Sequence, residues 1–153
     1  MNPQFLTDAD VYRRVGGADK LSQLIDPERT GQWNQDTLDT AKQDACNQVL
    51  AAAGVQSEHV TDVSDFRDKF PHLVTIAAQK AVILSWTYGT SGMAIPDALR
   101  ELSAELSAAM EDLSRNRRAH GSVTYSPTAS RSMNGAVSVA ANTLTSWQRT
   151  PFC

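Results

Sequence analysis

The residue types that most often carry out chemistry are few in this chain and stand apart from one another. The three histidines, His59, His72 and His120, lie in different segments, which favours surface or core-edge histidines over a metal site. Gly16-Gly17 follows a predicted helix, which favours a helix stop over an anion-binding loop. The run at residues 89–92 lacks the surroundings of a nucleophile elbow or a phosphate loop. We therefore predict no catalytic residue, no metal and no cofactor, and expect that the protein is not an enzyme.

The cysteines and the apolar runs indicate the compartment. Cys46 and Cys153 do not form a disulfide framework, which favours a reducing environment. The N-terminal residues show no basic region followed by an apolar core, as a signal peptide would require. The apolar run at residues 73–86 is interrupted by polar residues and is too short to span a bilayer. We expect a soluble protein that is made in the cytoplasm and has no membrane partner.

Charge is distributed unevenly along the chain. All 17 acidic residues lie before Gly121, together with 12 of the 14 basic residues. Residues 121–153 carry Arg131 and Arg149 and no acidic residue. An acidic body argues against a domain that grips nucleic-acid phosphates through a basic face, although it does not exclude DNA passing close by.

Residues 121–153 have the composition of an arm that binds another protein. They are rich in Ser, Thr, Ala and Asn and poor in large apolar residues, so they cannot bury enough apolar surface on themselves to offset the loss of chain entropy. The segment nevertheless ends with Trp147, Arg149 and Phe152. Aromatic and arginine side chains at the end of a long polar spacer are typical anchors for docking on a partner. We therefore predict an extended docking arm that is anchored by these three residues.

Arg115, Arg117 and Arg118 form the basic cluster of the sequence. They lie at the end of a predicted helix, where positive charge stabilises the helix C-terminus. A second interpretation is a contact with an acidic partner surface or with DNA phosphate. The sequence leaves both interpretations open.

Residues 8–120 are predicted to form helices that are joined by short loops and turns. Thr7 predicts the start of a helix at residues 8–15, and a short amphipathic segment follows at 18–25. A clearer helix begins at Asn34 or Asp36 and ends at Gly54. After a loop at 55–63, Ser64-Asp65 is expected to cap a short turn. Further helices are predicted from Pro71 to about Trp86 or Tyr88, and from Pro96 to His120.

The predicted fold class is therefore all-α: a small bundle of about four helices at residues 1–120, with the extended arm at 121–153. The 71–88 helix is apolar on most sides and is expected at the centre of the core. In the last helix a narrow apolar seam is expected to pack along another helix, either in the same bundle or in a neighbouring subunit. Its members are Leu99, Leu102, Leu106, Met110 and Leu113.

The N-terminal third of the chain resembles the Mu-like head–tail adaptor (connector or head completion) proteins of tailed bacteriophages. The resemblance is carried by Phe5-Leu6-Thr7-Asp8-Ala9-Asp10-Val11, by Arg14-Val15-Gly16-Gly17, by Leu21, Leu24 and Ile25-Asp26, and by Asp36, Leu38, Ala41 and Asp44-Ala45. The sequence departs from the family pattern at residues 50–55, where the family often has an Arg-Tyr pair and a proline.

This resemblance implies a structural protein of the virion neck. Adaptors of this kind are small helical proteins that form a homo-oligomeric ring, commonly of twelve copies, beneath the portal protein. The ring extends the DNA channel and provides the attachment platform for the stopper or tail completion protein. Double-stranded DNA would pass through the channel without sequence-specific binding, which an acidic body favours because it repels phosphate. The C-terminal arm would then dock on the portal.

Two other functional classes are alternatives. The chain could be another neck or tail completion protein, namely a stopper or a tail terminator. These proteins are usually richer in strands, so helical content discriminates between them and an adaptor. It could instead be a small intracellular helical regulator that binds DNA or a host protein. Such a regulator would bind duplex DNA in a salt-dependent manner or be found outside virus particles.

Overall fold

The computed structural model describes residues 3–26, 34–90 and 93–120. In these ranges the chain forms helices and no strand, which confirms the all-α class. The helices are α1 (Asp8–Val15), α2 (Ala18–Ile25), α3 (Gln35–Ala53), α4 (Val63–Lys69), α5 (Pro71–Gly89) and α6 (Asp97–His120), with a short 3₁₀ turn, η1 (Ser57–His59), between α3 and α4.

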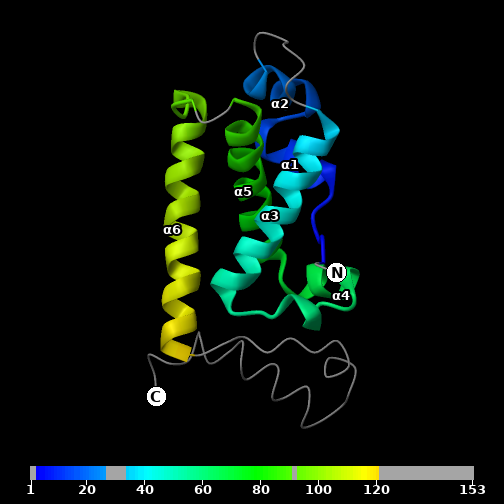
Figure 1. Cartoon of the computed structure of the whole chain (residues 1–153). Coiled ribbons are helices and arrows are strands. Elements are labelled where there is room, and N and C mark those ends of the chain that lie inside the picture. The colour runs from blue at the N-terminus through cyan, green and yellow to red at the C-terminus, as the bar shows by residue number, and fades with distance from the viewer. Residues whose placement is uncertain (1–2, 27–33, 91–92, 121–153) are drawn as a thin grey trace.

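Three long helices dominate the bundle. Figure 1 shows that α3 descends, α5 ascends beside it and α6 descends again at the edge of the molecule. The central helix is α5, which contacts α1, α2, α3, α4 and α6. One row of α5 has small buried side chains at four-residue steps, namely Ala77, Ala81, Ser85 and Gly89. Because α3 makes the most extensive contact with α5, we infer that this row permits the close approach of the two helices.

Local signals define the corner between α1 and α2. Thr7 and Asp10 form a capping box, in which each side chain accepts a hydrogen bond from the backbone N–H of the other residue. Gly16 ends α1 in the left-handed conformation with φ 87°, and Gly17 follows with φ 132°. The Gly-Gly pair therefore ends α1, as predicted, and α2 begins directly after it.

The core lies between α3, α5 and the N-terminal helices. Asn34 caps the start of α3, and Gly54 ends it with φ 74°. The aromatic rings of Phe5, Phe66 and Phe70 stack in sequence, with centroid distances of 4.9 Å and 5.1 Å. The fully buried side chains also include Val11, Leu21, Ile25, Leu38, Val49, Leu73 and Val82. This cluster connects the segment before α1 to α4, so the N-terminal residues belong to the core.

The structure corrects three details of the sequence prediction. The described residues form six α-helices instead of about four, because the short segment at 18–25 (α2) and the short turn after residue 63 (α4) are complete helices. Asp62, and not Ser64-Asp65, caps α4, since its side chain accepts from the backbone N–H of Asp65. The polar pattern of its helix predicts Lys42 on an outer face, but Lys42 is buried, and two carboxylates pair with its amine.

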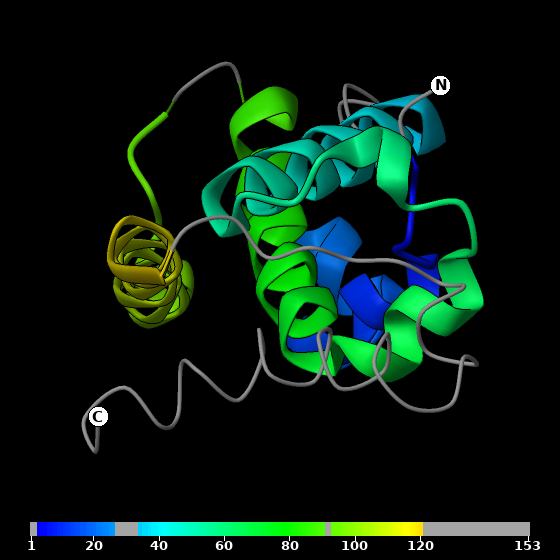
Figure 2. The ribbon, with the colours of Figure 1, turned by 90° about the horizontal axis from the view of Figure 1, so that it is seen from below.

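The last helix lies at the side of the bundle. Seen from below in Figure 2, α5 lies between α6 on one side and α1 on the other. The contacts agree with this view, since α6 packs on α3 and α5. A helix of 24 residues is about 36 Å long, so α6 presents a long outward face.

Candidate interaction surfaces

The predicted seam of α6 packs on the protein's own core. Leu99, Leu106 and Leu113 recur at seven-residue steps and are 2%, 4% and 4% exposed. Leu102 and Met110 are half-buried beside them. All five side chains therefore lie on the face that α6 turns toward α3 and α5. A contact of this seam with a neighbouring subunit stays a prediction. Such a contact would have to involve Leu102 and Met110, because the other three leucines are buried within the chain.

The predicted basic cluster is divided between two roles. Arg115 forms ion pairs with Glu111, at 2.9 Å, and Asp112, at 3.4 Å, on its own helix. Arg117 instead donates to the backbone carbonyl oxygen of Ala51, at 2.8 Å, near the C-terminus of α3. A guanidinium group at that position satisfies an end carbonyl of the helix and stabilises its C-terminus. The side chain of Arg118 lies outside the described residues.

The predicted arm, with Trp147, Arg149 and Phe152, lies outside the described residues. The structure shows where the residue before the predicted arm lies. α6 reaches His120 at the lower end of the bundle in Figure 1, the end at which α3 finishes and α4 begins.

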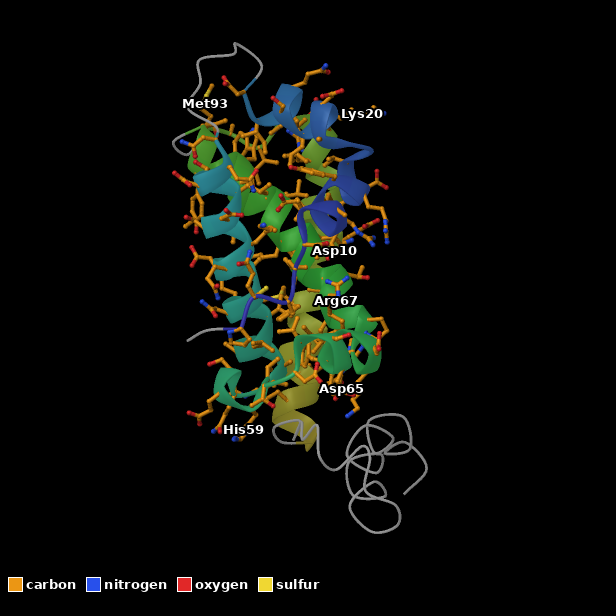
Figure 3. The ribbon with its side chains drawn as sticks, turned by 90° about the vertical axis from the view of Figure 1, so that its right-hand side faces the viewer. Asp10, Lys20, His59, Asp65, Arg67 and Met93 are labelled. Atoms are coloured by element: carbon orange, nitrogen blue, oxygen red, sulfur yellow. The ribbon has the colours of Figure 1, made fainter. Side chains whose placement is uncertain are left out.

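The structure reveals a charged cluster that the sequence did not predict. Arg67 of α4 contacts Asp10 of α1 through two hydrogen bonds, of 2.7 Å and 3.2 Å, and donates to the carbonyl oxygen of Phe5 at 2.6 Å. Figure 3 shows Asp10 and Arg67 next to each other on the side of the molecule opposite α6. Burial alone would raise the pKa of the Asp10 carboxyl, but the hydrogen bonds from Arg67 and Thr7 outweigh it and hold that pKa well below its usual range.

A hollow of about 240 Å³ lies beside this ion pair, between α1, α4 and α5. Apolar groups come from Pro71, Val74 and Ala78 of α5. Arg13, Arg14, Arg67, Asp10, Asp68 and Thr75 complete its lining. Arg13 and Arg14 are exposed and form no ion pair within the described part of the chain. The hollow therefore combines an apolar floor with two guanidinium groups that are open to an acidic partner.

The outward face of α6 has the opposite character. Glu101 and Glu105 are four residues apart, as are Ala104 and Ala108, so the four residues share one side of α6, and all four are exposed. Neither glutamate forms an ion pair within the described residues. α6, which carries this acidic face, and α1, which carries the two arginines, lie on opposite sides of α5 in Figure 2.

A second buried charge links α1 to α3. The Lys42 amine bonds to the carboxylates of Asp8 and, at 2.7 Å, Asp39, and Gln35 donates to both carboxylates at 3.1 Å. Desolvation alone would lower the pKa of Lys42, but its two carboxylate partners outweigh that effect and raise it. A lysine that is held protonated in this way stabilises the fold and is no general base.

The described residues contain no group of three or more His, Cys, Asp or Glu side chains that could hold a metal ion. Burial raises the pKa of the Cys46 thiol to about 11, although hydrogen bonds from the backbone at Phe5 and Leu6 oppose the shift. Such a thiol is largely protonated at neutral pH and is a poor nucleophile. No helix in the described ranges is long and apolar enough to cross a membrane.

Comparisons with family models, with curated proteins and with solved structures find no match to this chain.

Proposed function

We propose that this protein is a head–tail adaptor of the virion neck, which forms a ring beneath the portal protein, extends the DNA channel and carries the stopper or tail completion protein. The proposal rests on the resemblance of the N-terminal third of the chain to the Mu-like adaptors. It includes a homo-oligomer of about twelve copies, DNA that passes without sequence-specific binding, and a C-terminal arm that docks on the portal.

One observation supports the proposal most strongly: many of the residues that carry the resemblance form the caps, the turn and the buried faces of α1, α2 and α3. Thr7 and Asp10 form the capping box, and Gly16-Gly17 makes the turn. Val11, Leu21, Ile25, Leu38, Ala41 and Ala45 are buried. A resemblance located in caps, turns and core positions is one of fold, because these positions determine how the helices pack.

Two further features favour the adaptor over the alternatives. The described residues form helices, whereas stoppers and tail terminators are usually richer in strands. Arg13 and Arg14, which are exposed and lack an acidic partner among the described residues, border a hollow that apolar groups of α5 also line. A regulator that grips DNA would be expected to have a broader basic face.

The proposal is tested by binding to portal assemblies from the same genome, followed by imaging of the complex. The expected result is a ring that is coaxial with the portal. A chain cut after His120 should keep its helical circular dichroism spectrum and lose portal binding. Trp147→Ala combined with Phe152→Ala should weaken binding similarly, because it removes the aromatic anchors. The matched control, Thr145→Ala with Thr150→Ala, should bind normally.

Two results would contradict parts of this proposal. If the truncated chain binds portal as well as the full chain does, the arm is not the anchor. If the full chain binds no portal but binds duplex DNA in a salt-dependent manner, the regulator is the better interpretation.

A further inference from the structure

We infer that the outward face of α6 docks into the arginine-rimmed hollow of a second copy of this chain, so that copies associate front to back. This inference rests on the proposed function, since it names the contact between neighbouring subunits of the ring. Each chain carries both halves of the contact, the hollow on one side and the α6 face on the other.

The charges of the two surfaces are complementary. Arg13 and Arg14 border the hollow without an acidic partner, and Glu101 and Glu105 lie on α6 without a basic partner, within the described residues. Guanidinium and carboxylate groups that are brought together across an interface form strong, directional hydrogen bonds. Two carboxylates line the hollow, Asp10 and Asp68, and Asp10 is paired with Arg67. The two positive charges of Arg13 and Arg14 therefore exceed the single negative charge of Asp68.

The shapes also agree. The glutamates alternate with Ala104 and Ala108, whose small side chains let a helix approach another surface closely. The hollow offers Pro71, Val74 and Ala78 as an apolar floor, and its volume of about 240 Å³ is several times the space of one water molecule, about 30 Å³. The small residues can thus rest over apolar groups while the carboxylates reach the arginines at the rim.

The placement of the two surfaces suits a ring. α1, which carries the two arginines, and α6 lie on opposite sides of α5 in Figure 2, and α1 lies level with the upper half of α6 in Figure 1. A front-to-back contact closes into a ring when each copy is rotated slightly from the last, by roughly 30° for a ring of about twelve. Such a small rotation requires contact surfaces on nearly opposite sides of each copy, and the placement of α1 and α6 on either side of α5 is compatible with this.

Charge reversal with exchange tests the contact. Variant A carries Arg13→Glu and Arg14→Glu, and variant B carries Glu101→Arg and Glu105→Arg. Self-association of the full-length chains is measured by sedimentation and by imaging, alone and with portal assemblies. Each variant alone should require at least about tenfold more protein to associate, because like charges then meet at every contact. An equimolar mixture of A and B should associate again, since alternating copies restore opposite charges.

The controls separate charge from folding. Circular dichroism should show that A and B keep the helical content of the wild type. Asp36→Arg with Glu58→Arg reverses exposed charges away from both surfaces and should leave association unchanged. Raising the salt concentration should weaken wild-type association, because exposed ion pairs are screened.

The outcomes distinguish a failure of the proposed contact from a failure of the proposed function. Unchanged association of A or B, or a mixture that stays dissociated, overturns the contact while leaving the adaptor function intact if wild-type rings still bind portal. Rescue in the mixture without any binding to portal supports the contact and overturns the adaptor function. A wild-type chain that remains a monomer alone and with portal overturns both.

Discussion

Arg67 Nη1 lies 2.7 Å from Asp10 Oδ2, and this contact joins α4 to α1 across 57 residues of sequence. The same guanidinium group holds the carbonyl oxygen of Phe5, whose ring packs on Phe66. One side chain therefore fastens the N-terminal segment, the first helix and the aromatic part of the core.

Removing the Asp10 charge should destabilise the protein in a pH-dependent manner. Asp10→Asn weakens a partly buried, charge-assisted pair and should lower the free energy of unfolding at pH 7 by about 2–3 kcal/mol. The pKa of Asp10 is lower in the folded chain than its ordinary 3.8, so the stabilisation is complete above about pH 4 and is lost as the pH falls further. Urea unfolding at pH 7 and pH 3 measures this difference. Asp68→Asn, at an exposed neighbouring position, should change stability by less than about 0.5 kcal/mol.

A side chain at Gly17 should be costly although there is room for it. A Cβ at this position would meet no heavy atom within 4 Å, but the backbone has φ 132° and ψ 164°, a region that residues other than glycine rarely adopt. Gly17→Ala should therefore reduce the free energy of unfolding by about 1–3 kcal/mol. Gly16→Asn is the control, because asparagine tolerates the left-handed conformation at φ 87°. If both variants unfold at the wild-type urea midpoint, the corner does not depend on glycine.

The phenol of Tyr88 should lose its proton at a higher pH than an ordinary tyrosine does. Its hydrogen bond of 2.7 Å to Asp44 raises the pKa of Tyr88 to about 12, and burial adds to the shift. Because the folded pKa exceeds the unfolded value of 10.0, the contribution to stability is complete below pH 10 and is lost as the pH rises toward 12. NMR of ring-labelled tyrosine should show Tyr88 unshifted at pH 10.5. In Asp44→Asn the resonance should move near pH 10, and an unchanged titration would show that the bond does not form in solution.

The docking of α6 should depend on its buried leucines. Leu106 is 4% exposed, so Leu106→Ala should lower the free energy of unfolding by about 2–5 kcal/mol through lost burial and the resulting cavity. Leu102→Ala, at a half-buried position of the same helix, should have a clearly smaller effect. Hydrogen exchange should show whether α6 detaches while α3 and α5 stay protected. Equal effects of the two substitutions would contradict the packing described for α6.

Much of the helical layout could be predicted because its signals are local. Thr7, Gly16-Gly17, Gly54 and Pro71 act on backbone groups within about one turn, so their residue types are sufficient to begin or end a helix. The seven-residue spacing of Leu99, Leu106 and Leu113 likewise predicted one apolar face of α6, and the structure buries that face.

The partners of the charged residues could not be predicted in this way. From sequence, Asp8 and Asp10 are acidic residues of a first helical turn, where they favour the positive end of the helix. In the structure each also binds a cation, which lies 34 residues away for Asp8 and 57 residues away for Asp10. Lys42 lies among polar residues in a helix pattern that gives no sign of burial. Periodicity assigns a residue to a face of its own helix but carries no information about what another helix brings to that face.

The sequence by itself therefore determined the helical class, the helix ends and the apolar faces, because hydrogen bonding and capping within a helix involve neighbours in the chain. Only the tertiary structure decided that α6 packs by its leucines on α3 and α5, and that α6 and α1 lie on opposite sides of α5. These arrangements depend on how the helices pack, and packing is set by contacts between residues that are distant in sequence.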